Sequence, residues 1–270
     1  MKLQRVERAD DARLEGYALV AQPAALRQAG WFVAEGRLVV ERVLAERRYQ
    51  FESVLLNEAA LAALEPALRE DTAPIYLCPN ALFEALTGYD FHRGCLGLVR
   101  RPPPLDWRTL AASARALVVL EGVSNHDNIG GVFRNASAFG ADAVLLDPSS
   151  ADPLYRKAIR TSMGASLRVP FATIGAEGGA PWPQCLGELA AHGFALTALT
   201  PDAGARDLDE LTTAVRAERL ALLFGSEGTG LSASALAACH QRVRIAIRPE
   251  VDSLNLAVAC GIALQRLLPR

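Results

Sequence analysis

From residue 116 onward, short apolar runs alternate with helix-like runs along this chain. Alternation of this kind predicts a parallel β-sheet covered by helices on both faces. In such sheets, ligands bind outside the carboxyl ends of the strands. The expected strands are Ala116–Leu120, Ala143–Leu146, Leu167–Phe171, Ala195–Leu199, Leu220–Phe224 and Val243–Ile247, and the expected helices are Ile129–Phe139, Ser149–Ser162 with interruptions, Trp182–His192, Ser232–Cys239 and Leu254–Leu268.

A triple proline at residues 102–104 marks the clearest boundary in the chain. Consecutive prolines remove backbone donors and favour an extended conformation. We therefore predict a linker at residues 101–108, a smaller N-terminal α/β domain at 1–100 and a larger domain at 109–270. In the N-terminal domain we expect helices at Gly36–Arg47, Glu58–Arg69 and Asn80–Leu86, and strands at Phe51–Leu56, Ile75–Leu77 and Gly94–Val99.

The composition is that of an ordinary globular protein rather than a disordered one. The 270 residues are 51% hydrophobic and 21% charged, which is enough for two cores. No apolar run reaches the roughly 20 residues that span a bilayer, and residues 1–8 lack an apolar signal core, so we expect a cytoplasmic location. The formal net charge is −2, so any contact with nucleic acid must come from a local arginine patch.

The cysteines give no metal-binding pattern. The five are scattered without a C-x-x-C pair, and His240 beside Cys239 has no second pair to complete a zinc site. We therefore predict buried, reduced thiols and no metal.

Three short polar stretches, Asn128–Asn135, Phe224–Leu231 and Val251–Leu256, each join the end of an apolar run to the start of a helix-like run. Taken singly, each has a structural explanation, because asparagine and serine cap helices and glycine permits tight turns. Gly225 and Gly230 fit the spacing of a phosphate-binding loop, but Leu231 stands where that loop has lysine. As local features, we expect Asn128 or Ser253 to cap the helix that follows it.

Taken jointly, the three stretches resemble the signature motifs of the SpoU/TrmH family of RNA methyltransferases, within the SPOUT class. The first motif, N-x-G-(A/G)-x-x-R, is matched by Asn128, Gly130, Gly131 and Arg134. The second, G-x-E-x-x-G, is matched by Gly225, Glu227 and Gly230, and the third, S-L-N, by Ser253, Leu254 and Asn255. The motifs come in the family's order, and the resemblance covers about residues 115–268.

The resemblance implies a C-terminal parallel-sheet domain tied into a deep trefoil knot, a homodimer, S-adenosylmethionine as cofactor and methyl transfer to a ribose 2′-hydroxyl of RNA. The implied cofactor-binding residues are Gly225, Ile245 and Leu254. The implied catalytic residues are Asn128, Arg134, Glu227, Ser253 and Asn255, with Glu227 expected to pair with or position Arg134. Because guanidinium groups stay protonated in proteins, we expect Arg134 to hold a phosphate and stabilise the developing alkoxide rather than to act as a base.

The N-terminal domain resembles, more loosely, ribosomal-protein-like RNA-binding domains, with Phe32–Val40 as the best matching piece. Its candidate RNA contacts are Arg37, Arg42, Arg47 and Arg48, and a further basic cluster is formed by Arg156, Lys157 and Arg160. By analogy, this extra domain favours ribosomal RNA over transfer RNA as the substrate. The chain departs from the usual family pattern at Ala246 and Asn135, where proline and threonine are common.

Two alternatives remain open at this point. One is an RNA-binding or ribosome-assembly protein that kept the fold but lost catalysis, which the intact motif residues argue against. The other is a Rossmann-type enzyme acting on a small molecule, which the missing G-x-G-x-x-G fingerprint argues against.

Overall fold

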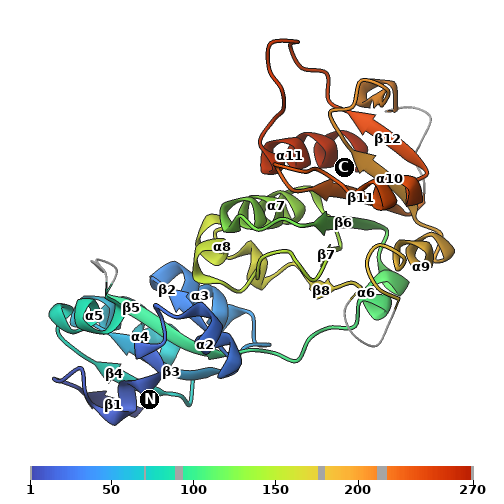
Figure 1. Ribbon diagram of the computed structural model, residues 1–270. Helices are drawn as coiled ribbons and strands as arrows, with labels where there is room; N and C mark the ends of the chain where they lie inside the picture. The colour runs from blue at the N-terminus through green and yellow to red at the C-terminus, as the bar shows by residue number, and fades with distance from the viewer. Residues whose placement is uncertain (1, 70, 89–93, 176–179, 212–217, 269–270) are drawn as a thin grey trace. The chain divides into compact units, whose positions relative to one another are not determined.

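The computed structural model describes residues 2–69, 71–88, 94–175, 180–211 and 218–268. The chain divides into two compact units (Figure 1). The first contains Met1–Pro103 and Leu154–Leu167, and the second contains Pro104–Pro153 and Arg168–Arg270. The division after Pro103 falls inside the predicted linker. The segment Leu154–Leu167 belongs to the first unit, although in sequence it lies between two strands of the second.

The second unit contains a sheet of seven described strands, all parallel, which confirms the predicted class of fold. Their order across the sheet is β10-β12-β9-β11-β6-β7-β8. The strands are β6 (Ala116–Glu121), β7 (Ala143–Leu146), β8 (Phe171–Thr173), β9 (Ala195–Leu199), β10 (Arg206–Asp207), β11 (Leu220–Gly225) and β12 (Gln241–Arg244). The helices are α6 (Trp107–Ser113), α7 (His126–Phe139), α9 (Leu186–Ala191), α10 (Ala233–Ala238) and α11 (Leu256–Leu267), with a 3-10 turn at Leu208–Leu211.

Both faces of this sheet are covered, which explains why its central strands are apolar throughout. On one face, Leu117 and Val119 of β6 pack with side chains of α6, α9 and α10. Alternate residues point to the opposite face. There α7 packs on the sheet, with the ring of Phe133 edge-on to Phe171 of β8 at 5.7 Å between centroids. Helix α11 lies alongside α7 (Figure 1).

Prolines account for two differences from the predicted elements. The helix expected over Ser149–Ser162 is only the short α8 (Arg156–Thr161), because Pro153 provides no backbone donor and its ring disfavours a helical residue before it. The strand expected at Leu167–Phe171 begins only at Phe171, after Pro170. Leu167 instead ends a 3-10 turn, Ala165–Leu167.

The first unit contains a mixed sheet of five described strands in the order β1-β4-β3-β5-β2. These are β1 (Lys2–Arg5), β2 (Trp31–Glu35), β3 (Phe51–Leu56), β4 (Pro74–Leu77) and β5 (Cys95–Arg100). Its longer helices are α3 (Arg37–Ala45), α4 (Glu58–Leu68) and α5 (Asn80–Thr87), which confirm the three predicted ones. Five further elements were not expected from the sequence: β1, β2, a 3-10 turn at Ala12–Leu14, α1 (Glu15–Ala18) and α2 (Pro23–Gln28).

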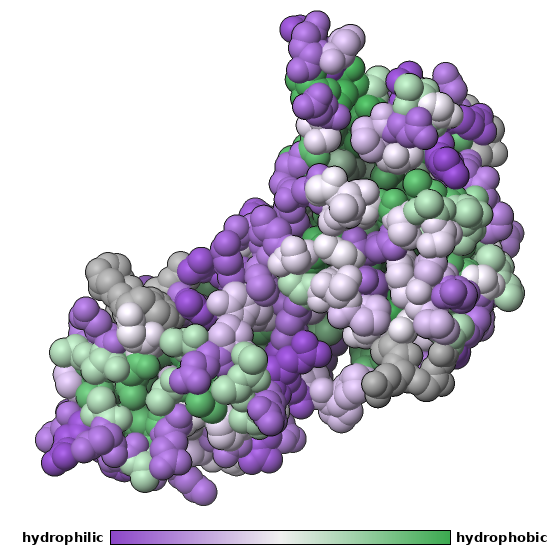
Figure 2. Space-filling model, in the orientation of Figure 1, coloured by the Kyte–Doolittle hydropathy of each residue, from purple (hydrophilic) through white to green (hydrophobic). Residues whose placement is uncertain are grey.

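The core of the first unit lies on both faces of this sheet. Tyr17, Phe83 and Leu98 belong to the cluster on one face, beneath α1, α2 and α5. In Figure 2, hydrophilic residues cover most of the visible surface, and hydrophobic residues appear between them as separate patches. Within the described ranges, every helix is too short or too polar to cross a membrane.

Candidate functional site

The first predicted motif lies where β6 leads into α7. The helix begins at His126, three residues earlier than expected, and its N-cap is Asn125, whose side chain accepts a hydrogen bond from the Asp127 backbone N–H at 2.9 Å. The expectation that Asn128 caps this helix was therefore wrong. Asn128 lies in the first turn and is 3% exposed. Its amide is thus available for another partner, and buried polar groups need one.

That partner is Asn255, which is itself the N-cap of α11. Its Oδ1 accepts from the backbone N–H groups of Ala257 at 3.0 Å and Val258 at 3.3 Å. Its Nδ2 donates to Asn128 Oδ1 at 2.8 Å and to Glu227 Oε1 at 3.2 Å. The expectation that Ser253 caps α11 was therefore wrong. One asparagine side chain caps a helix with its oxygen and joins the three sequence motifs with its nitrogen.

A cavity of about 360 Å³ opens beside these side chains, at the carboxyl ends of β9 and β11. The three residues expected to hold a cofactor, Gly225, Ile245 and Leu254, all line it, as do Glu227 and Ser253. Ile245 was expected inside a strand, but β12 ends at Arg244, so Ile245 is the first residue after it. The walls combine aliphatic side chains with the main chain of the Gly225–Gly230 turn.

The glycines of that turn are needed for different reasons. A Cβ at Gly225 would overlap the main chain of Gly230 and Leu231, because the turn folds back on itself there. Gly230 has φ +66°, a left-handed conformation that favours glycine, and its N–H donates to the Ser226 carbonyl at 2.9 Å. A Cβ at Gly228 would meet nothing within 4 Å. Two of the three glycines therefore shape the turn, and Gly228 leaves open space at the cavity.

A carboxylate holds the far end of the same turn. Glu121 is the last residue of β6 and lies opposite Gly225 in the parallel register. One of its oxygens accepts from Trp182 Nε1 at 2.5 Å, and the other accepts from the Ser232 backbone N–H at 2.8 Å. Ser232, the first residue of the helix expected at Ser232–Cys239, is the N-cap of α10. Sequence reasoning missed Glu121, since a single acidic residue at a strand end gives no motif.

Arg134 lies on α7 with an exposed side chain. It makes no hydrogen bond or ion pair with any residue that the structure describes, so the expected pairing with Glu227 is not seen; Glu227 contacts Asn255 instead. Arg134 lines a shallower groove of about 660 Å³ between α7 and α11, together with Asn135, Phe139 and Val258.

Ser253 is exposed at the cavity. Of the five residues expected to be catalytic, hydrogen bonds therefore bring Asn128, Glu227 and Asn255 together, and Arg134 and Ser253 stand apart from them.

The close packing of α7 and α11 positions Asn255. A Cβ at Gly131 would lie 2.5 Å from the Cβ of Ala257, so glycine lets the two helices approach. Asn135 Nδ2 donates to the Ala257 carbonyl at 2.6 Å. Ala257 is one of the residues whose N–H Asn255 caps, so this bond holds the first turn of α11 against α7.

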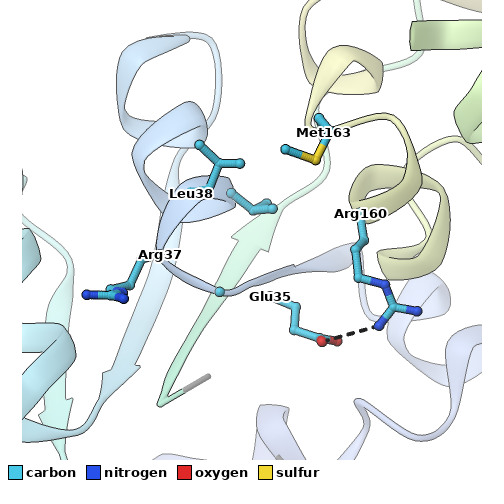
Figure 3. Close-up of a pocket in the computed structure, with 7 residues that line it drawn as sticks. Glu35, Arg37, Leu38, Arg160 and Met163 are labelled. Carbon is cyan, nitrogen blue, oxygen red and sulfur yellow. Dashed lines mark ion pairs between the residues drawn. The ribbon is translucent and has the colours of Figure 1, made fainter. Parts of the chain in front are cut away.

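The predicted basic cluster Arg156, Lys157 and Arg160 lies on α8, in the first unit. Glu35 of β2 forms ion pairs with Arg156 at 3.1 Å and with Arg160 at 3.6 Å, the latter drawn in Figure 3. The Glu35 side chain is only 6% exposed. At least two of the three cations are therefore neutralised in part by a buried carboxylate.

The thiols are unsuited to nucleophilic chemistry. All five cysteines are free, and four of them are buried. Burial raises the pKa of Cys185 and of Cys239 to about 11. Within the described ranges, no group of His, Cys, Asp and Glu side chains is arranged to hold a metal ion.

The cavity has further lining residues that sequence reasoning missed. Leu199, Thr200 and Pro201 lie at the carboxyl end of β9. Since β9 and β11 are neighbours in the sheet, their carboxyl ends meet at one edge, where ligands bind in parallel sheets. The sequence signal for these three lining residues was therefore their position at the end of a predicted strand. Only the order of the strands shows that this end lies beside Gly225.

Comparisons with known proteins point to one family. The model of the SpoU rRNA Methylase family matches residues 115–265. A protein of Mycobacterium bovis named as an uncharacterized tRNA/rRNA methyltransferase is 40% identical over 260 residues, covering 94% of this chain and 88% of its own. The 23S rRNA (guanosine(2553)-2′-O)-methyltransferase of Bacillus subtilis is 24% identical over 267 residues, covering 98% and 99%.

Solved structures share the fold of this chain. A crystal structure of AdoMet-bound rRNA methyltransferase from Sinorhizobium meliloti superposes with a TM-score of 0.81 at 20% identity, over 98% of this chain and 97% of that one. A crystal structure of an RNA 2′-O ribose methyltransferase gives a TM-score of 0.78 at 25% identity, over 98% of both chains.

Proposed function

This chain belongs to the SpoU rRNA methylase family, and we propose that it transfers a methyl group from S-adenosylmethionine to a ribose 2′-hydroxyl of ribosomal RNA. The observation that carries the proposal is the amide of Asn255, which bonds Asn128 and Glu227 at the edge of a cavity. This arrangement places three polar side chains from distant parts of the chain beside a site that a small molecule can enter. The choice of ribosomal RNA rests on the presence of a separate N-terminal unit and on the relatives' names.

The cavity fits the cofactor in its chemistry. Aliphatic side chains of Ile245 and Leu254 suit the faces of an adenine ring, and the glycine turn leaves main-chain N–H and C=O groups at the lining. The open space at Gly228 admits a ligand against the backbone. We assign Gly225, Ile245 and Leu254 to holding S-adenosylmethionine, which supplies an electrophilic methyl group when bound.

The protein's part in the reaction is to orient the ribose and to stabilise charge as its hydroxyl loses a proton. We assign the orientation to Asn128 and Asn255, with Glu227 holding the Asn255 amide in place. Arg134 has a guanidinium with no partner among the described residues, so its N–H groups are available to an RNA phosphate and to the developing alkoxide. Ser253 is exposed at the cavity, where its hydroxyl can order the bound ligands.

We further propose that the protein acts as a homodimer through the α7–α11 groove. Phe139 and Val258 line this groove and are 36% and 51% exposed, so the groove presents two apolar side chains next to Arg134. A second copy covering the groove would bury them next to Arg134. Light scattering of the Val258→Asp variant tests this: we expect a dimer for the wild type and a monomer for the variant.

Two measurements test the proposed activity. Ribose-methylation mapping of total RNA, from cells with and without the protein, should show one site that disappears from ribosomal RNA. Calorimetry with S-adenosylmethionine should show saturable heat. No heat and an unchanged methylation map would instead support an RNA-binding or assembly protein on the same fold.

A further inference from the structure

The first unit contains a second cavity, also of about 360 Å³, which is lined by none of the residues assigned to methyl transfer (Figure 3). Its lining comes from the end of β2, the start of α3, α8 and the residue Met163 that follows α8. The seven lining residues are Glu35, Gly36, Arg37, Leu38, Val39, Arg160 and Met163. Acidic, basic and long aliphatic side chains therefore meet around one hollow.

Met163 is the least expected of these residues. Its φ is +54°, and it is the one non-glycine residue with positive φ among those the structure describes. This conformation is costly for any residue with a Cβ, and glycine would relieve the cost. The side chain is also 48% exposed, so burial does not repay that cost. A strained and exposed methionine contributes little to stability, and residues held in this way are often found at binding sites.

Leu38 forms the facing wall. It lies in the first turn of α3 and is 42% exposed. Figure 3 shows the Leu38 and Met163 side chains directed toward each other across the hollow. Two flexible aliphatic side chains facing each other in this way can enclose a flat apolar ring.

The polar side of the cavity is formed by Glu35 and Arg160, which are ion-paired at 3.6 Å. Glu35 also pairs with Arg156 at 3.1 Å. Arg37 lies at the rim with its side chain directed away from Met163, and it makes no hydrogen bond or ion pair within the described ranges (Figure 3). Two guanidinium groups thus pair with one carboxylate and a third lies at the rim, and this excess of positive charge favours an anionic ligand.

We propose that this cavity binds one unpaired nucleotide of the RNA substrate, with its base between Leu38 and Met163. The pair of Glu35 and Arg160 presents an acceptor and donors to the polar edge of the base, and Arg37 at the rim meets a neighbouring phosphate. Sequence-specific proteins read RNA mostly through such unstacked bases, held between side chains and hydrogen-bonded along their edges. The inference rests on the proposed function, since it assigns the cavity to the RNA substrate.

The test compares three variants with the wild type by fluorescence anisotropy, using a labelled single-stranded RNA and the blunt duplex of the same sequence. Met163→Gly removes the apolar wall and the backbone strain together, and Leu38→Ala removes the facing wall; neither changes the charge. We expect each to weaken single-strand binding roughly tenfold and to leave duplex binding unchanged. Leu3→Ala is the matched control, because Leu3 is an exposed aliphatic side chain of β1 outside the cavity.

Stability and cofactor binding separate this proposal from simpler explanations. We expect Met163→Gly to unfold at the same temperature as the wild type or higher, since it removes strain, and to bind S-adenosylmethionine normally. Wild-type affinity of Met163→Gly for single-stranded RNA would overturn the nucleotide site and leave the proposed function intact. If the wild-type protein bound neither the single-stranded RNA nor the duplex, that result would contradict both the nucleotide site and the proposed function. Displacement of the RNA by an equal concentration of nucleoside monophosphate would show a site for free nucleotides and overturn the proposal.

Discussion

The amide nitrogen of Asn255 lies 2.8 Å from the amide oxygen of Asn128, although 127 residues separate them in the chain. The same nitrogen lies 3.2 Å from Glu227. Because the Asn255 oxygen also caps α11, movement of this helix changes the contacts of the Asn255 amide with Asn128 and Glu227. Stability of the helix start and geometry of the site are therefore linked through one residue.

Asn255→Asp separates these two roles. Aspartate caps a helix as well as asparagine does, so we expect the contribution of the cap to change by less than about 0.5 kcal/mol. Loss of the bond to the buried Asn128 should cost about 1–3 kcal/mol of unfolding free energy. The variant has no N–H to donate, and its carboxylate repels Glu227. We expect methyl transfer to fall about 100-fold, measured with labelled cofactor and RNA. Asn255→Ala, which also loses the cap, should lose about 1 kcal/mol of stability in addition. Full activity of Asn255→Asp would remove the amide from the mechanism.

Arg134→Ala tests the proposal that Arg134 acts as a fixed positive charge that holds an RNA phosphate and stabilises the developing alkoxide. The side chain is exposed and has no described partner, so its removal should leave the melting temperature unchanged. We expect turnover to fall about 100-fold and the affinity for S-adenosylmethionine, measured by calorimetry, to stay the same. Arg134→Lys keeps the charge but loses the planar fork of donors, so it should recover only part of the rate. Wild-type turnover in the alanine variant would contradict the assignment.

Gly225→Ala should damage the cofactor site through the main chain. The added Cβ would overlap the backbone of Gly230 and Leu231, which cannot move as a flexible side chain could. We expect a loss of about 1–3 kcal/mol in unfolding free energy and weaker cofactor binding. Gly187→Ala in α9 is the control, because a Cβ there meets nothing within 4 Å. That variant should be as stable as the wild type or more stable by up to about 1 kcal/mol.

Glu121 and Trp182 should be energetically coupled. The two carboxylate oxygens accept from two different donors, Trp182 Nε1 and the Ser232 N–H. Glu121→Gln has one amide oxygen and can satisfy only one of them, so we expect a loss of about 1–3 kcal/mol. A cycle of Glu121→Gln, Trp182→Phe and the double variant, measured by urea denaturation, should give a coupling of about 0.5–3 kcal/mol. Additive effects would show that the contact contributes nothing of its own.

The cysteines should be unreactive in the native protein. Burial raises the pKa of Cys78 and of Cys95 to about 12, above the value for an ordinary thiol. A raised thiol pKa means that the reactive thiolate forms only at higher pH, so alkylation should be slow at pH 8 and should accelerate as the pH approaches these values. We expect iodoacetamide at pH 8 to leave methyl transfer unchanged, and to modify all five cysteines once the chain is unfolded. Rapid inactivation of the native protein would contradict this.

Several strands could be predicted because each is a short, largely apolar run. β7, β9 and β3 have the bounds expected from the sequence. The helix caps could not be predicted in the same way, because a cap depends on the residue at which the helix begins. α7 begins at His126, so the cap is Asn125, and Asn128 is free to bond Asn255. Asn125 and Asn128 are both asparagines near the start of α7, and only the packing of the chain shows which of them caps the helix.

The sequence alone determined the class of fold and the family, because buried strands must be apolar and because three motifs recur in a set order. It did not determine which residues touch. The bond between Asn255 and Asn128 depends on the close approach of α7 and α11 at Gly131. Likewise, the position of α8 in the first unit brought Arg160 to Glu35. Hydrogen bonds and ion pairs depend on distances of a few ångströms, and only the packed chain sets those.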